Sequence, residues 1–386
     1  MFWKIIKNIV FYLFLIGLIT VALYYFWAPR YYFPESEVFY GKKIFNPYQV
    51  NSTTQWQRVG IDTRPVWYED LTQQLTGDEE PVFIDKNYYD TLLVAGNQRI
   101  VSKDQPIYKQ GLFHDDHFVI GCDKISWYDY PFVRDIHNKQ HRINKIHSKG
   151  CLLYLKPSAF FVDYQADHPQ KLQNYNGFLV DESFEQSIHL WDRALSTGKY
   201  KTLLAKALPK NQRFKPEKQY RIIYIPRNDT TMEYNLQRGN YYVAAKFQRN
   251  DNSVNPKELK SLLSEVKVKN DTLVISTASP AFAINFFTQD GDIRKVVQDT
   301  GEASYHIKRN DTYIRAEILF ENGTRYYLNP VHRYSGNSPH NYMRTHQNTF
   351  KTWLFRGVGI FGTIIVVWIL LYIKRRLRIE IREPKS

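Results

Sequence analysis

The sequence predicts an α/β domain and a smaller antiparallel β-sandwich-like domain, held between two transmembrane helices. Long apolar runs lie near both ends of the chain, and short apolar strands alternate with helical stretches between them. After about residue 256 the pattern changes to period-two alternation with tight turns. The chain has 386 residues, 43% of them apolar, which is enough for two domains with buried cores.

The first apolar run, residues 8–27, is uncharged and has the length that a membrane-spanning helix needs. It is long for a signal peptide, and ALYYFWAPR at its end lacks the small-x-small cleavage pattern, so we interpret it as an uncleaved anchor. The second run, residues 353–373, carries Arg356 near one end, where the side chain can reach the headgroups. Close packing with the first run or with a partner helix is favoured by its small residues, Gly357, Gly359 and Gly362.

Basic residues lie on the terminal side of each run. Lys4 and Lys7 are in the N-terminal segment 1–7, and the C-terminal tail 374–386 begins with KRRLRIEIR. Basic clusters of this kind are retained in the cytoplasm. We therefore expect a two-span protein of the bacterial inner membrane, with both termini in the cytoplasm and the main domain in the periplasm.

The charge and the cysteines restrict the partners and the compartment. The formal net charge is +14, which permits anionic partners. Nucleic acid is not expected as a partner, because no binding motif is present and the compartment argues against it. Cys122 and Cys151 each adjoin strand-like sequence. Adjacent strands would bring them together as a disulfide in an oxidising compartment, and buried free thiols are the alternative.

A connector, residues 28–55, leads into an α/β region over residues 56–255. Residues 183–210 show its pattern most clearly, because an apolar helical stripe ends at Gly198 and the strand KYKTLLAKA follows. Further helices are predicted in PFVRDIHNKQHRINKIHSKG and MEYNLQRGN. The predicted strands are TLLVAG, HFVIGC, CLLYLK, GFLVD, KTLLAK and YRIIYIP. This alternation favours a mostly parallel sheet, either open or closed into a barrel.

Residues 256–334 predict the β-sandwich-like domain. The strand-like segments are DTLVISTA, AFAINFFTQDGDIRKVVQD, ASYHIKR and TYIRAEILFENGTRYYLNPV. Asp290-Gly291 and Asn322-Gly323 predict tight hairpins within them. A polar linker, residues 335–352, then leads to the second apolar run.

The order of these segments resembles the PHP (polymerase and histidinol phosphatase) superfamily, and in particular its membrane-bound, Bacteroidetes-type members. The resemblance covers most of residues 56–334 and is carried by INKIHSKGCLLYLKPS, LWDRALSTGK, LQRGNYYVA and TYIRAEILFENGTRYYLNPV. It implies a distorted (β/α)7 TIM-like barrel with divalent metals at the carboxyl ends of its strands. Typical members hydrolyse phosphoesters with two or three metal ions.

The five metal-binding motifs of that family depart from their usual pattern in this chain. Approximate matching places other residues at the ligand positions: Asp62, Asn97, Asp123 or Lys124, Lys156, Lys206 and Lys210. A two-metal site needs several carboxylates and imidazoles to activate water and stabilise the leaving oxygen. We therefore expect no catalytic residue, no bound divalent metal and no other cofactor.

Lysines at these positions suggest an anion-binding site in place of a metal site. Lys156, Lys206 and Lys210, together with Lys124, would converge on the barrel mouth and attract a phosphate-like anion. The alternative is that they are solvated loop lysines in a lysine-rich protein.

Two histidine-containing stretches give weaker signals. His137 and His141 lie four residues apart on a predicted helix, a spacing that can chelate zinc, but their polar neighbours favour a solvated face. The stretch FHDDHF, residues 113–118, precedes a predicted strand, and we interpret it as a polar turn.

These features together predict a membrane-anchored, non-catalytic PHP-like domain, a pseudo-phosphoesterase, that serves as a binding or assembly component of the bacterial cell envelope. Its expected partners are the membrane and other envelope or inner-membrane proteins. Two alternatives stay open. One is a metal-dependent phosphoesterase with an altered metal site, and the other is a receptor for an anionic ligand at the lysine-lined mouth.

Overall fold

The structure is a computed structural model that describes residues 2–33, 41–62, 84, 86–94, 107–110, 117–122, 128–130, 135–156, 168–180, 184–208, 219–227, 230–246, 259–340 and 345–380. The chain divides into two compact units. Unit 1 comprises residues 1–33, 130–142 and 345–386, and unit 2 comprises residues 34–129 and 143–344.

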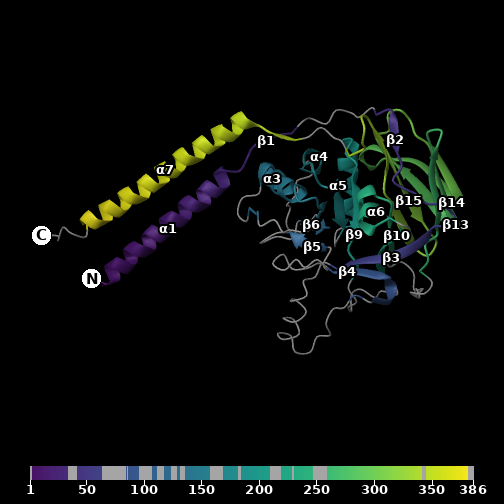
Figure 1. The fold of residues 1–386 in the computed structure, drawn as a ribbon, viewed down its shortest axis with the longest axis horizontal. Helices are drawn as coiled ribbons and strands as arrows, with labels where there is room; N and C mark the ends of the chain where they lie inside the picture. The colour runs from purple at the N-terminus through teal and green to yellow at the C-terminus, as the bar shows by residue number, and fades with distance from the viewer. Residues whose placement is uncertain are drawn as a thin grey trace. The chain divides into compact units, whose positions relative to one another are not determined.

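Unit 1 is built on two long helices, α1 (Phe2–Phe26) and α7 (Thr349–Glu380), which run side by side (Figure 1). Ile5–Phe26 and Thr349–Arg376 are long and apolar enough to cross a membrane. Their apolar side chains are largely exposed, as expected of helices whose solvent is lipid. The structure thus contains candidate spans at both predicted places.

Short polar contacts join the chain segments next to these helices. β1 (Tyr31–Tyr32) pairs antiparallel with β18 (His346–Gln347). The Arg30 side chain forms an ion pair with Asp135, and its guanidinium lies 3.4 Å from the centroid of the Phe355 ring. The Arg30 backbone N–H donates to Oγ1 of Thr352 at 2.9 Å. One arginine therefore links the end of α1, the start of α7 and the segment before α3 (Ile136–His147).

Gly359 lets α1 and α7 approach each other closely. A Cβ atom at residue 359 would lie 2.1 Å from the ring of Phe26, well inside van der Waals contact. The Phe26 ring also packs on Phe355, with 5.1 Å between the centroids. Gly357 and Gly362 have no such neighbour. Of the three glycines in the predicted packing stripe, Gly359 is the one that contacts the first span.

We expect Gly359→Leu to destabilise the helix pair by about 1–3 kcal/mol, because the new side chain and the Phe26 ring would occupy the same space. Thermal unfolding of the full chain in lipid nanodiscs should show a lower Tm. Gly362→Leu is the matched control, because it adds the same side chain to the same helix where space is open. Equal losses from both substitutions would contradict the contact.

Unit 2 contains a mixed sheet of 11 described strands, whose main path is β12-β13-β15-β16-β11-β10-β3-β4. Along this path only β3 and β4 pair in parallel. β14 pairs with β13, and β17 connects β15 to β2. The strands are β2 (Lys43–Phe45), β3 (Gln55–Asp62), β4 (Thr91–Val94), β10 (Tyr220–Arg227), β11 (Tyr242–Lys246), β12 (Leu263–Lys269), β13 (Thr272–Phe287), β14 (Ile293–His306), β15 (Tyr313–Leu319), β16 (Thr324–Leu328) and β17 (Val331–Tyr334).

The predicted hairpins are confirmed in this sheet. Asp290 and Gly291, with φ of 57° and 81°, lie in the turn η3 (Gln289–Gly291) between β13 and β14. Gly323, with φ of 80°, lies in the turn between β15 and β16. A stacked group of tyrosines that includes Tyr224, Tyr242 and Tyr326 fills the core against this sheet.

A second sheet in unit 2 has the order β5-β6-β7-β8-β9. β7, β8 and β9 run parallel, whereas β5 with β6 and β6 with β7 are antiparallel. The strands are β5 (Ile107–Gln110), β6 (His117–Ile120), β7 (Leu152–Leu155), β8 (Gly177–Val180) and β9 (Thr202–Ala205). The helical elements nearby in the chain are η1 (Lys86–Tyr88), α4 (His168–Lys171), α5 (Phe184–Ser196) and α6 (Met232–Arg238).

Cys122 and Cys151 form a disulfide bond, with 4.9 Å between their Cα atoms. Because Ile120 pairs with Leu152 in the antiparallel register, Cys122, two residues after β6, comes close to Cys151, the residue before β7. Of the two alternatives for these cysteines, the structure therefore contains the bonded pair.

The prediction of a mostly parallel sheet is correct for β7, β8 and β9, and for β4, which pairs in parallel with β3. It is wrong for the predicted strands that form β6 and β10, which pair antiparallel with their neighbours. A parallel crossover must carry the chain back along the strand that it follows. The eight residues of β10 span about 26 Å, but the seven residues of α6 rise only about 10 Å. The chain therefore turns back and β11 pairs antiparallel with β10. The described strands of unit 2 form two sheets and no closed barrel.

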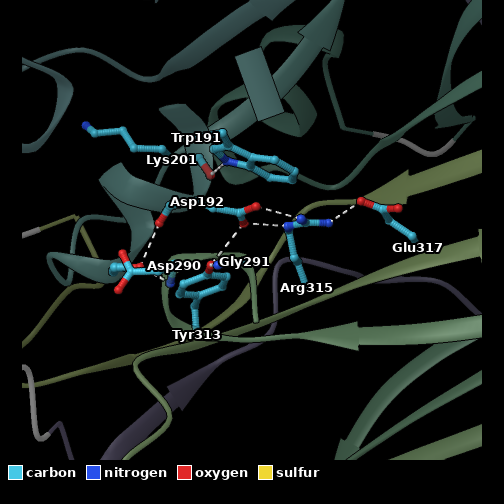
Figure 2. A network of polar contacts seen from close by, with 9 residues as sticks. Trp191, Asp192, Lys201, Asp290, Gly291, Tyr313, Arg315 and Glu317 are labelled. Atoms are coloured by element: carbon cyan, nitrogen blue, oxygen red, sulfur yellow. Dashed lines mark hydrogen bonds and ion pairs between the residues drawn. The ribbon is translucent and has the colours of Figure 1, made fainter. Parts of the chain in front are cut away.

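Strands from both sides of residue 255, the predicted domain boundary, share the large sheet. A buried polar network also links α5 to β15 (Figure 2). Nε and Nη2 of Arg315 each donate to a different carboxylate oxygen of Asp192 at 2.6 Å, and the Tyr313 hydroxyl donates to the same carboxylate at 2.9 Å. Nη1 of Arg315 donates to Glu317 at 2.5 Å. This network, which we call the Asp192–Arg315 clasp, ties the α/β elements to the β elements.

Candidate functional site

Three of the seven residues predicted at the degenerate metal site are described. Asp62 is buried at the carboxyl end of β3, and Lys206 follows the carboxyl end of β9. The backbone N–H of Ala207 donates to the carbonyl of Ile61 at 2.9 Å, so these two strand ends meet. Lys156 is half-buried just after β7, which runs parallel to β9 within one sheet. Outside the described residues lie Asn97, Asp123, Lys124 and Lys210.

Metal-ligating side chains do not gather in the described part of the chain. Among those residues, no group of three or more histidine, cysteine, aspartate or glutamate side chains is placed to hold a metal ion. Nδ1 of His137 accepts from the backbone N–H of Tyr31 at 3.0 Å, and Nδ1 of His141 lies 2.6 Å from the Tyr130 hydroxyl. His137 and His141 thus lie on one helix but have separate partners.

A cavity of about 330 Å³ in unit 2 is a second candidate site, which the sequence analysis did not predict. We call it the amide pocket, because amide side chains make up half of its lining. The lining residues are His147, Gln173, Asn174, Tyr175, Asn176, Tyr200, Gln237 and His340.

The loop between α4 and β8 supplies half of this lining, and Asn176 holds it in place. The backbone N–H of Asn176 donates to the carbonyl of Leu153 at 2.6 Å, and its Oδ1 accepts from the Leu153 N–H at 2.8 Å. Its carbonyl accepts from the backbone N–H of Thr202 at 3.0 Å. Asn174 has a left-handed backbone, φ 63°, and its Nδ2 donates to Oδ1 of Asn144 at 2.8 Å. The loop is therefore attached to strands on both sides.

Tyr200 forms an aromatic wall of the pocket. Its hydroxyl donates to the carbonyl of Arg238 at 2.8 Å, and its ring makes edge contacts with Phe45 and His340 at 5.1 and 5.3 Å between centroids. Gly239 ends α6 with φ 85°, and a Cβ there would lie 2.1 Å from the Tyr200 hydroxyl oxygen. A glycine at residue 239 therefore adopts the left-handed conformation that ends the helix, and it leaves space for the Tyr200 hydroxyl.

Among the described residues, the lining contains no side chain of Asp, Glu, Lys or Arg. Desolvation of the His340 ring, followed by the charges of Lys201 and Arg238, lowers the pKa of that histidine, which favours a neutral ring at pH 7. Three polar groups of the lining make no hydrogen bond to another described residue: Oδ1 of Asn174, Nδ2 of Asn176 and the side-chain amide of Gln237. The pocket thus offers both donors and acceptors to a ligand.

Two buried lysines, Lys199 and Lys201, bond to the α4–β8 segment of the chain. Nζ of Lys199 donates to the carbonyls of Gln170 and Leu172, and Nζ of Lys201 donates to the carbonyl of Tyr175. The Lys201 ammonium also lies 3.9 Å from the centroid of the Tyr175 ring. Burial lowers the pKa of Lys199 to about 7. Burial, together with the charge of the neighbouring Lys199, lowers the pKa of Lys201 well below that of a free lysine.

These lysines make stability depend on pH. Between about pH 7 and 10.5 the unfolded chain binds a proton on Lys199 that the folded chain has lost, so the free energy of unfolding rises with pH, by at most about 1.4 kcal/mol per pH unit for this group. We expect the Tm of the full chain to rise from pH 7 to pH 9. Lys199→Met should reduce this slope, and the exposed control Lys260→Met should leave it unchanged. An unchanged slope in Lys199→Met would contradict the assignment.

We compared the chain with family models, curated proteins and solved structures, and none of them matches. The candidate sites therefore rest on the residues of this chain alone. One sequence signal could have indicated the amide pocket: the segment KLQNYNGFLV places three amide side chains and a tyrosine directly before a buried strand.

Proposed function

We propose that this protein is a two-span, membrane-anchored binding or assembly component of the bacterial cell envelope, with a PHP-like but non-catalytic domain in the periplasm. The disulfide between Cys122 and Cys151 is the observation that supports a periplasmic location of this domain. Disulfides persist in oxidising compartments such as the periplasm and are rare in the cytosol. With the candidate spans at both ends, this favours the orientation in which the basic flanks stay in the cytoplasm.

A binding role is supported by the amide pocket. Its uncharged lining has donors and acceptors but no pair of carboxylates and no cluster of metal ligands among the described residues. Hydrolytic chemistry generally needs such groups to activate water. This lining supports the binding of a molecule rather than its hydrolysis.

The anionic-ligand receptor is the second candidate. It is supported by the meeting of the carboxyl ends of β3 and β9, because Lys206 directly follows β9 there. The buried Asp62 lies at the same junction, and its carboxylate would oppose a phosphate there. We therefore favour the binding or assembly role at the amide pocket over anion capture at the strand ends.

Thiol labelling of the full chain in intact bacteria tests the compartment. Cells are denatured in acid, and a large maleimide is added with or without prior reduction. We expect no addition before reduction and two additions after it, since the chain has two cysteines. A reporter enzyme that is active only in the cytoplasm should be active when fused after residue 386. Two free thiols before reduction, or an inactive but intact reporter, would overturn the proposed orientation.

Metal analysis of the purified full chain tests the non-catalytic assignment. We expect less than about a tenth of a divalent metal ion per chain, too little for two-metal hydrolysis. One or more tightly bound ions per chain, together with chelator-sensitive phosphoesterase activity, would replace this proposal with the altered-site phosphoesterase.

A further inference from the structure

The amide pocket has the chemistry of a site for a neutral polyhydroxylated molecule. Four amide side chains and two tyrosines line it, together with two histidines. Amides can both donate to and accept from hydroxyl groups, and aromatic rings pack against the apolar C–H faces of a ring-shaped ligand. Sugars have both hydroxyl groups and apolar C–H faces.

The unpartnered groups come from two parts of the chain, the loop between α4 and β8 and the helix α6. Nδ2 of Asn176 is a fixed donor, because the backbone N–H of Leu153 occupies its Oδ1. Oδ1 of Asn174 is the matching acceptor, because its Nδ2 donates to Asn144. Gln237, on the exposed side of α6, adds an amide that bonds to no described residue. Burying such groups against an apolar ligand would leave them unsatisfied, so the pocket selects a polar one.

An anion is a poor fit for the same lining. No lysine or arginine is among the described residues that line the pocket. Nζ of the buried Lys201 is directed to the carbonyl and ring of Tyr175. The Asn174 acceptor would face the oxygens of a phosphate or carboxylate without a proton between them. Charge-assisted bonds, the usual basis of anion recognition, are missing from this lining.

The size of the cavity limits the ligand. About 330 Å³ is at the small end of the range for ligand pockets, which runs from roughly 300 to 1,000 Å³. Hydrolysis of a bound sugar would need two carboxylates on either side of the glycosidic bond, and the described lining residues include none. A short ligand that is bound and released unchanged agrees with both observations.

We propose that the amide pocket binds a neutral sugar of one or two rings, recognised through its hydroxyl or acetamido groups by the side chains of Asn174, Asn176 and Gln237. This inference rests on the proposed function, since it names the ligand class of the periplasmic binding domain. Envelope polysaccharides and free sugars share this chemistry.

The test uses the full chain in lipid nanodiscs, prepared without glycoside detergents because their headgroups would compete for the site. The probes are cellobiose, maltose and N,N′-diacetylchitobiose, with inorganic phosphate as the anionic probe. Saturation-transfer NMR detects binding, and a titration of each probe gives its Kd. We expect at least one of the three disaccharides to bind and phosphate not to displace it.

Two variants connect the binding to the pocket. Gln237→Leu removes an exposed amide that bonds to no described residue, so folding should be retained, and we expect the Kd for the sugar to rise about five- to tenfold, as for one or two lost hydrogen bonds. His340→Ala removes the ring that packs on Tyr200 and should weaken binding as well. Gln186→Leu, an exposed glutamine on α5 outside the pocket, is the matched control and should leave the Kd unchanged.

Each outcome separates the inference from the proposed function. If none of the three disaccharides binds while the thiol labelling places the domain in the periplasm, the sugar inference is overturned and the proposed function stands. Phosphate that displaces the sugar would overturn the neutral-ligand assignment, and sugar binding that neither pocket variant weakens would place the site elsewhere. Free thiols in cells would overturn the proposed function whatever the probes do.

Discussion

Arg315→Met should lower the free energy of unfolding by about 3–5 kcal/mol, because it leaves the carboxylate of Asp192 buried without its cation. Arg315 and Asp192 are 2% and 4% exposed, so water cannot take the place of the guanidinium. Burial alone would lower the pKa of Arg315, but its hydrogen bonds to Asp192 and the charge of that carboxylate outweigh burial and raise it. The arginine therefore stays charged at every pH at which the protein folds.

Chemical denaturation of the full chain in nanodiscs, followed by tryptophan fluorescence, measures this loss. Trp191 is fully buried, and its ring lies 5.4 Å from the Arg315 guanidinium, so its emission reports directly on the clasp. Arg309→Met removes the same charge from an exposed position and should cost less than about 0.5 kcal/mol. The double variant Asp192→Leu with Arg315→Met should recover part of the loss, because the buried carboxylate of Asp192 is removed together with its cation and Glu317 is the only charged group of the clasp that loses a partner. A single variant as stable as the Arg309 control would show that the clasp contributes nothing.

Replacing both cysteines by serine should lower the free energy of unfolding by about 3–4 kcal/mol. The disulfide joins positions 29 residues apart, and closing a loop of this length in the unfolded chain accounts for a stabilisation of that size. The chain around Cys122 is otherwise held by a strand of four residues, β6, so the bond also constrains a short element.

Reduction of the natural chain provides the control for this prediction. The Tm of the reduced protein should fall to that of the Cys122→Ser, Cys151→Ser variant, and the variant itself should not respond to reductant. A reduced protein as stable as the oxidised one would mean that the bond adds no stability. The periplasmic location would then be tested by the thiol labelling alone.

Local sequence patterns determined a large part of the secondary structure. The apolar runs near the termini correspond to α1 and α7, since a long uncharged stretch has no other low-energy conformation in lipid. The stripe that ends at Gly198 corresponds to α5, and the buried strand β9 follows it. Asp290-Gly291 and Gly323 lie in the turns where the positive φ angles of tight hairpins were expected. Each of these signals is contained within a few neighbouring residues.

Strand direction depended on contacts that no local pattern encodes. The strands β8 and β10 are both buried along nearly their whole length, yet β8 pairs in parallel and β10 antiparallel. The length of the intervening helix and the partners available in the sheet decide between these arrangements, and both are properties of the folded chain. The same is true of Cys122 and Cys151, whose bonding depended on the register of β6 against β7.

The predicted site shows the same division. Sequence reasoning placed Lys156 and Lys206 at the ends of predicted strands, and they directly follow β7 and β9. It predicted no strand that ends at Asp62, which lies at the carboxyl end of β3. It did not find the amide pocket, because Asn176, Tyr200, Gln237 and His340 come from four separate segments of the chain and none belongs to a known motif. The sequence by itself determined the apolar spans, the helices and the turns, because these depend on neighbouring residues. Only the tertiary structure brought distant polar side chains around one cavity, because that arrangement depends on how strands pair and where loops are anchored.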